Sequence, residues 1–196
     1  MNPYTLSVVI PVYNSEDILE DLLEELFSEL PNFAKQYEVI LVNDGSPDGS
    51  WDKITELGKK HEQLLGINLQ RNFGQHNAML AGILASKNDV ILTMDDDMQH
   101  PPQAIGLLLE KLQEGADVVY GSPIKQTHNF FRDSCSALVK YAFEITIGVD
   151  IARDMSAFRA FHTHLKKAFV ECHNLCLLYT SPSPRDATLS RMPSSA

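Results

Sequence analysis

The chain has 196 residues, 44% of them hydrophobic and 21% charged, a composition typical of a globular domain and not of a disordered chain. Its 26 acidic and 16 basic side chains give a net charge of −10 and a pI near 5.0. This charge argues against nucleic acid as a partner, because nucleic-acid binding needs a basic surface. Residues 1–120 carry 20 acidic and 7 basic side chains, whereas residues 121–196 carry 6 and 9.

Cysteine usage and hydropathy exclude two further classes of protein. The three cysteines, of which Cys172 and Cys176 lie four apart, are too few for a closed zinc site. The sequence has no run of 18 apolar residues, so we expect no transmembrane segment and only a peripheral contact with a membrane. We expect a reducing, cytosolic setting.

The first 122 residues alternate short apolar runs with amphipathic stretches. The runs predict strands at residues 6–10, 37–42, 64–69, 90–94 and 117–121. Pro11 is expected to end the first strand, and Ser15 to cap a helix whose apolar stripe runs from Ile18 to Leu30. Further helices are predicted at 51–61, 75–85 and 101–112. Repeated β-α-β units predict an α/β fold with a mostly parallel sheet covered by helices on both faces.

The pattern changes after residue 122. Residues 130–147 and 163–171 predict helices, and residues 154–161 are short and mixed in character. Residues 178–196 hold three prolines and five serines without a periodic apolar face. This last stretch is either a disordered tail or a sequence that is not native to the protein.

Three acidic residues follow the predicted strand at 90–94, and ligands bind at such strand ends in parallel sheets. Alternate residues of an extended segment share a face, so Asp95 and Asp97 could converge on one ion. Gln99 could add a neutral oxygen. Oxygen ligands with open positions suit Mg²⁺ or Mn²⁺, completed by substrate phosphates. The alternative is an acidic turn that caps the next helix.

Two shorter polar motifs follow the first and second predicted strands. In Asn43-Asp-Gly-Ser46, the glycine permits a tight turn and Asp44 can accept a hydrogen bond from a base N–H; an ordinary Asx turn is the alternative. In Pro11-Val-Tyr-Asn14, the Tyr13 ring could stack on a base. The sequence lacks the glycine-rich loops of Rossmann and P-loop proteins.

The order and spacing of five segments carry a family resemblance. SVVIPVYN, EVILVNDGSPDGS, NLQRNFGQHNAMLAG, VILTMDDDMQHPP and ADVVYGSP resemble the family-2 inverting glycosyltransferases of the GT-A fold, and most closely their polyprenyl-phosphate branch. The resemblance covers about residues 5–172. It implies a nucleotide-sugar-binding half at 1–122 and an incomplete acceptor-side half at 123–176, leaving 177–196 as the tail.

The resemblance implies a metal-dependent, inverting transfer of a sugar from a UDP- or GDP-linked donor to a polyprenyl phosphate. The cofactor would be Mg²⁺ or Mn²⁺, the setting the cytoplasmic face of a membrane, and a homo-oligomer is possible. The family's closing loop is not found in the sequence, so the alternative is an inactive, truncated nucleotide-sugar-binding fragment. A sugar nucleotidyltransferase is disfavoured, because the loop PVYNSED lacks glycine, arginine and lysine.

The resemblance also implies roles for individual residues. The nucleotide-sugar pocket would comprise Pro11, Tyr13, Glu16, Asp44, Ser46, Arg71, Asp95 and Asp96. The metal ligands would be Asp95, Asp97 and Gln99, and the catalytic residues Asp95, Asp97 and Arg132. The acceptor phosphate would contact Arg132, Ser136 and Arg159, since a guanidinium group matches phosphate oxygens bidentately. A pair between Arg159 and Asp154 is the alternative for that arginine.

Overall fold

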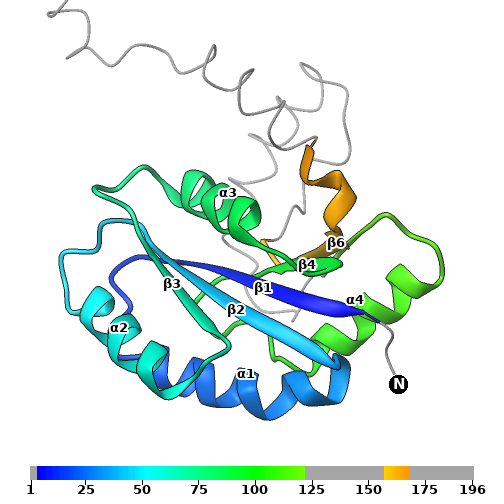
Figure 1. Cartoon of the computed structure of the whole chain (residues 1–196), viewed down its shortest axis with the longest axis horizontal. Coiled ribbons are helices and arrows are strands. Elements are labelled where there is room, and N and C mark those ends of the chain that lie inside the picture. Colours follow the sequence, from blue (N-terminus) through cyan, green and yellow to red (C-terminus); the bar gives the residue numbers. More distant parts are fainter. Residues whose placement is uncertain (1–3, 122–156, 168–196) are drawn as a thin grey trace, which may run out of the picture. The chain divides into compact units, whose positions relative to one another are not determined.

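The computed structural model describes residues 4–121 and 157–167 (Figure 1). The chain divides into two compact units, residues 1–163 and 164–196, and the fold described below is that of the first. The predicted helix at 130–147 and the tail at 177–196 lie outside the described residues, as do Arg132, Ser136 and Asp154. The elements are β1 (Thr5–Val12), α1 (Leu19–Phe33), β2 (Gln36–Asn43), α2 (Ser50–Lys60), β3 (Leu64–Asn68), α3 (Gln75–Ala85), β4 (Val90–Thr93), α4 (Ala104–Gln113), β5 (Val118–Tyr120), β6 (Arg159–His162) and a short 3-10 helix (Thr163–Leu165).

A single six-stranded sheet with the order β3-β2-β1-β4-β6-β5 organises the unit. Strands β1 to β4 pair in parallel, and β6 is antiparallel to both of its neighbours. The prediction of an α/β fold with a mostly parallel sheet is confirmed. Strand β6 comes from residues predicted to be short and mixed, because four residues give too little periodicity to reveal a strand whose partners are distant in sequence.

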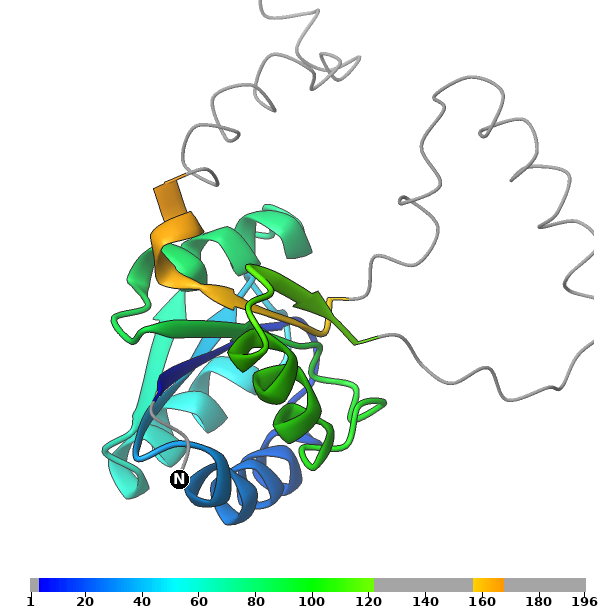
Figure 2. The same ribbon diagram turned by 90° about the vertical axis from the view of Figure 1, so that its right-hand side faces the viewer.

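Helices cover both faces of the sheet (Figures 1 and 2). Helices α1, α2 and α4 lie on one face and α3 on the other. The alternation of β1 explains this arrangement, since Leu6, Val8 and Ile10 enter the core shared with α1, whereas Val9 meets α3. In the part of the chain that the structure describes, no helix has the length and apolar character needed to cross a bilayer.

Two local predictions were wrong. Pro11 does not end β1, which continues to Val12. The backbone amide of Met94 donates to the carbonyl of Val9, so the backbone N–H and C=O groups of odd-numbered β1 residues point toward β4. The pairing of β1 with β4 ends at Val9, before Pro11 is reached. The missing N–H of Pro11 therefore costs no hydrogen bond between the strands. Ser15 does not cap α1, which begins at Leu19 without a side-chain cap.

Close packing of α3 on the sheet depends on Gly82. A Cβ atom there would lie 2.3 Å from Cγ1 of Val9 and 3.1 Å from Cγ2 of Val42. We expect Gly82→Ala to lower the free energy of unfolding by about 1–3 kcal/mol in urea denaturation, because the helix must move off the sheet. The control is Gly58→Ala in α2, where a Cβ meets nothing within 4 Å; it should raise stability by up to about 1 kcal/mol. Equal gains in both variants would contradict the packing argument.

Candidate functional site

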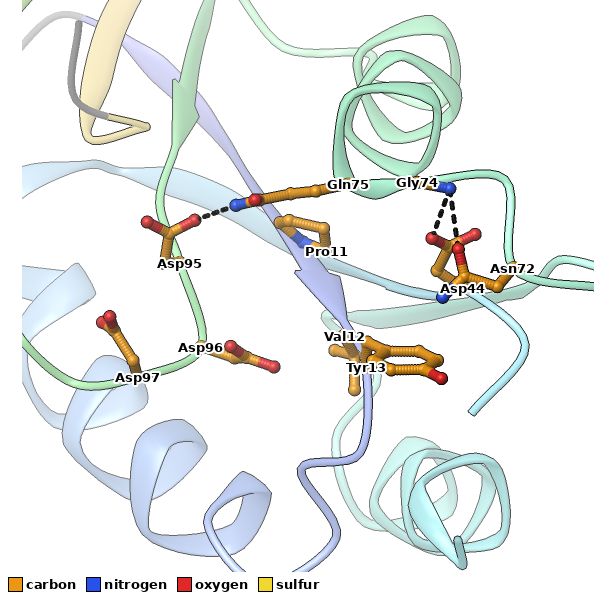
Figure 3. Close-up of a pocket in the computed structure, with 10 residues that line it drawn as sticks. All are labelled: Pro11, Val12, Tyr13, Asp44, Asn72, Gly74, Gln75, Asp95, Asp96 and Asp97. Atoms are coloured by element: carbon orange, nitrogen blue, oxygen red, sulfur yellow. Dashed lines mark hydrogen bonds between the residues drawn. The ribbon is translucent and has the colours of Figure 1, made fainter. Parts of the chain in front are cut away.

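A pocket of about 370 Å³ opens where β1, β2 and β4 end and α3 begins (Figure 3). Its size is within the range of small-molecule sites, and its position at the carboxyl ends of parallel strands is where α/β sheets bind ligands. The residues that line it come from four separate segments of the chain. They are Pro11, Val12, Tyr13, Asp44, Asn72, Gly74, Gln75, Asp95, Asp96 and Asp97.

Asp44 anchors one end of this pocket. Its side chain is 2% exposed, and its carboxylate accepts hydrogen bonds from the backbone amides of Phe73 at 2.7 Å and Gly74 at 2.8 Å. Each carboxylate oxygen thereby accepts one bond and keeps a lone pair that can accept another. Asp44 therefore fixes the loop before α3 and can still receive a donor from a ligand.

The turn after β2 is shaped by close backbone contact. Gly45 has φ +64°, and a Cβ there would lie 2.5 Å from the carbonyl carbon of Arg71, so a side chain is excluded. Next to it, Asn43 donates to Asn68 at 2.8 Å and accepts from the Ser46 hydroxyl at 2.5 Å. This packing holds the loop of Asp44 against the loop that leads to α3.

The three consecutive aspartates project to different sides of the segment after β4. In Figure 3, the carboxylate of Asp95 is directed to Gln75, that of Asp96 points toward Val12 and Tyr13, and that of Asp97 points away from them. Asp95 accepts a hydrogen bond from the side-chain amide of Gln75, the first residue of α3. Asp97 accepts the backbone amide of Gln99 at 3.0 Å.

The pKa of Asp95 is raised above its ordinary value. Partial burial is the largest cause, followed by the negative charges of Asp97 and Asp96; the charge of His100 and the hydrogen bond from Gln75 oppose them and only partly offset the rise. Within residues 4–121 and 157–167, no basic side chain forms an ion pair with any of the three aspartates. The pocket therefore presents negative charge that a cation would neutralise.

The donor set suits a hard divalent cation that a substrate completes. The described residues hold no group of three or more carboxylate, histidine or cysteine side chains arranged around one point. Mg²⁺ is often held by one or two carboxylates together with substrate phosphates, which is what Asp95 and Asp97 can offer. Gln99 is exposed and is not among the lining residues.

Several residues predicted for the nucleotide site lie outside the pocket lining. Glu16 is exposed and accepts the Gly49 amide at 2.9 Å, next to the start of α2. Ser46 accepts the Asn14 amide at 3.1 Å and so supports the loop after β1. Arg71 is exposed, with its guanidinium carbon 4.8 Å from the centre of the Phe73 ring. Their predicted contacts with a nucleotide remain predictions.

On the acceptor side, the structure describes only one of the predicted residues. Arg159 is half-buried in β6, opposite Thr93, and its Nη2 lies 3.3 Å from the sulfur of Met79 in α3. It therefore lies on the sheet face covered by α3, where Asp95 also meets Gln75. Because Arg132 and Ser136 are outside the described residues, the rest of the acceptor site stays a prediction.

The sequence analysis assigned no role to Gln75, Asn72 or Gly74. All three line the pocket because the loop before α3 folds over the end of β2. Their signal in the sequence was the segment RNFGQHN, which follows the third strand as the other polar motifs follow theirs. The rule that ligands bind at strand ends already points to Arg71 and Asn72 after the third strand, but Gly74 and Gln75 lie beyond that cluster, at the start of the next helix.

Comparison with known proteins defines first the class and then the family. The solved structures that this chain resembles are GT-A glycosyltransferases, so the chain has the GT-A fold. Residues 7–167 match the family model described as Glycosyl transferase family 2. The chain belongs to this family, as the sequence motifs had indicated.

Curated relatives point to one branch of the family. The chain is 36% identical over 169 residues to undecaprenyl-phosphate 4-deoxy-4-formamido-L-arabinose transferases from Klebsiella pneumoniae (strain 342) and Edwardsiella ictaluri (strain 93-146). Each alignment covers 86% of this chain and 52% of the relative. The chain thus spans about half the length of the curated relatives it matches.

More distant solved structures share the fold alone. Glucosyl-3-phosphoglycerate synthase from Mycobacterium tuberculosis, in complex with Mn²⁺, uridine diphosphate and phosphoglyceric acid, is 18% identical with a TM-score of 0.62. That match covers 83% of this chain and 57% of the synthase. A mannosyltransferase from Pyrobaculum calidifontis, in complex with GDP-Man and Mn²⁺, is 17% identical with a TM-score of 0.56, over 66% of this chain and 38% of its own.

The Asp44 carboxylate should be needed for the loop before α3. Asp44→Asn keeps one acceptor oxygen but turns an amide group toward a second backbone N–H, so one buried donor loses its partner. We expect the free energy of unfolding to fall by about 1–3 kcal/mol. Urea denaturation measures it, with the exposed Asp17→Asn as control. An equal, small effect of both substitutions would contradict the anchoring role.

Asp95 should destabilise the metal-free chain at neutral pH. A raised pKa means that the folded state disfavours the charged form of Asp95 relative to the unfolded state. The free energy of unfolding therefore falls as the pH rises from the ordinary pKa value of 3.8 through the raised pKa. In EDTA, Asp95→Asn should therefore melt higher than the unsubstituted chain near neutral pH, and the gap should close as pH falls toward 3.8. A lower melting temperature of the variant at neutral pH would contradict the assignment.

Proposed function

We propose that this chain binds a nucleoside-diphosphate sugar together with Mg²⁺ or Mn²⁺ in the pocket at the ends of β1, β2 and β4. The observation that supports this most is the arrangement of charge. Asp95, Asp96 and Asp97 line one end of the pocket, none of them in an ion pair with a lysine or arginine among the described residues, and Asp44 lies at the other end. A diphosphate with a divalent cation matches the aspartates after β4, and a base with an N–H donor matches Asp44.

The proposed roles follow from these positions. Asp44 accepts a base N–H with its free lone pairs, while the exposed ring of Tyr13 and the side chain of Pro11 flank the base. Asp95 and Asp97 hold the cation, and Gln99 lies within the same segment to add a neutral oxygen. The cation, when bound, supplies positive charge to the leaving diphosphate.

We further propose that the acceptor is a polyprenyl phosphate and that the sugar carbon is inverted in the transfer. The names of the curated relatives, which are undecaprenyl-phosphate transferases, support this acceptor. Arg159, with Arg132 and Ser136, would hold the phosphate. A phosphate monoester is already ionised near neutral pH, so it can attack without a strong base from the protein. Such an acceptor would bring the chain to the cytoplasmic surface of a membrane.

The proposal predicts binding that can be measured without turnover. Mn²⁺ with UDP or GDP should raise the melting temperature more than either component alone, because ligands that bind the folded chain stabilise it by mass action. Asp97→Asn should abolish the Mn²⁺-dependent part of that shift. Glu24→Gln, on the exposed face of α1, removes one acidic charge far from the pocket and should change nothing.

Transfer is tested separately from binding. Incubation with a UDP- or GDP-linked sugar, Mn²⁺ and undecaprenyl phosphate should give a glycosylated lipid phosphate, which mass spectrometry detects. Binding without transfer would favour the alternative of a nucleotide-sugar-binding chain that does not turn over. A chain that binds neither nucleotide nor Mn²⁺ would overturn the proposal.

A further inference from the structure

The hydroxyl of Ser15 connects the two sides of the pocket. Ser15 lies in the loop after β1, is 8% exposed, and donates a hydrogen bond to Oδ2 of Asp96, which lies 81 positions later in the segment after β4. The carbonyl of Tyr13, at 3.2 Å, is a second acceptor within reach. A hydroxyl has one proton, and a carboxylate is the stronger acceptor. The bond between Ser15 and Asp96 therefore crosses from one loop to the other.

The same loop is fixed on its other side by hydrogen bonds from its backbone amides to two serine hydroxyls. The amide of Asn14 donates to the Ser46 hydroxyl at 3.1 Å, and the amide of Ser15 donates to the Ser50 hydroxyl at 3.0 Å. Both serines follow β2. The backbone next to Tyr13 is thus held on both sides. Two backbone amides bond it to the serines after β2, and the Ser15 hydroxyl bonds it to the segment after β4.

Asp96 points in a different direction from the two aspartates proposed as metal ligands. Figure 3 shows its carboxylate on the side of the segment that faces Tyr13 and Val12, whereas Asp97 points away from them and Asp95 is directed to Gln75. Its oxygen is engaged by Ser15. This geometry suits a side chain that fixes the course of the segment on which Asp95 and Asp97 lie.

We propose that Ser15 and Asp96 are positioning residues, which set the separation between the Tyr13 end and the Asp95–Asp97 end of the pocket. The inference rests on the proposed function and deepens it. A ligand that spans both ends, such as a nucleoside diphosphate with a divalent cation, needs the two ends at a fixed separation. A ligand that touches one end only, such as a nucleoside or the cation alone, does not.

The test compares ligands of the two kinds in Ser15→Ala, a substitution that leaves the charge unchanged. Calorimetry should show that the affinity for UDP or GDP in the presence of Mn²⁺ falls about three- to tenfold. The affinities for Mn²⁺ alone and for uridine or guanosine alone should change less than about twofold. The matched control is Ser28→Ala in α1, whose hydroxyl bonds only within its own helix, to the carbonyl of Glu25.

A double-mutant cycle separates Asp96 from the other acceptor of Ser15. Asp96→Ala removes a charge and so weakens Mn²⁺ binding by itself, which is why the effect of Ser15→Ala is measured again in that background. If the bond to Asp96 carries the effect, the loss seen on Ser15→Ala should disappear when Asp96 is already alanine. If the bond to the Tyr13 carbonyl carries it, the loss should persist.

Four results would overturn the inference. They are an unchanged nucleoside-diphosphate affinity in Ser15→Ala, an equal loss for the nucleoside alone, an equal loss for Mn²⁺ alone, and a loss that persists in the Asp96→Ala background. All four are read against an unsubstituted chain that binds, so they leave the proposed function in place. An unsubstituted chain that binds neither Mn²⁺ nor nucleoside diphosphate overturns both proposals.

Discussion

The buried carboxylate of Asp44 is the contact on which the rest of the pocket depends. It directly follows β2 and accepts hydrogen bonds from two backbone amides of the loop before α3, so one side chain links the end of a strand to the start of a helix. Gly45 lets that loop approach to van der Waals contact, since any Cβ there would collide with the backbone of Arg71. The position of Gln75, and through it the hydrogen bond to Asp95, follows from this arrangement.

Electrostatics complements this anchoring. The segment after β4 brings three carboxylates to one end of the pocket, and burial together with mutual repulsion raises the pKa of Asp95. The fold tolerates this cost because polar donors are supplied locally, by Gln75, by Ser15 and by the backbone of Gln99. These donors orient the carboxylates without neutralising them, which leaves their charge available to a cation. A pocket of this kind suits the proposed ligand, a nucleoside diphosphate together with a divalent cation.

The family to which the chain belongs gives this geometry its chemical setting. The ends of β1, β2 and β4 surround one cavity, and the three aspartates lie directly after the end of β4. Strand β6 lies between β4 and β5 and places Arg159 on the face of the sheet that α3 covers. Arg159, proposed to hold the acceptor phosphate, therefore lies on the strand next to β4, which the aspartates follow.

The sequence by itself determined the α/β class, five of the six strands, the helices α1 to α4 and the identity of the motifs at the strand ends. Those features depend on local periodicity and on residues adjacent in the chain, such as the apolar run before Asp95. Tertiary structure alone decided that Pro11 continues β1, that Ser15 bonds to Asp96 instead of capping α1, and that residues 159–162 form a strand. Each of these depends on a partner far away in sequence, and periodicity carries no information about such partners. The excess of acidic residues that marks the first 120 residues is likewise a property of composition, whereas the directions of Asp95 and Asp96 are set by hydrogen bonds to Gln75 and Ser15, which lie on other segments around the pocket.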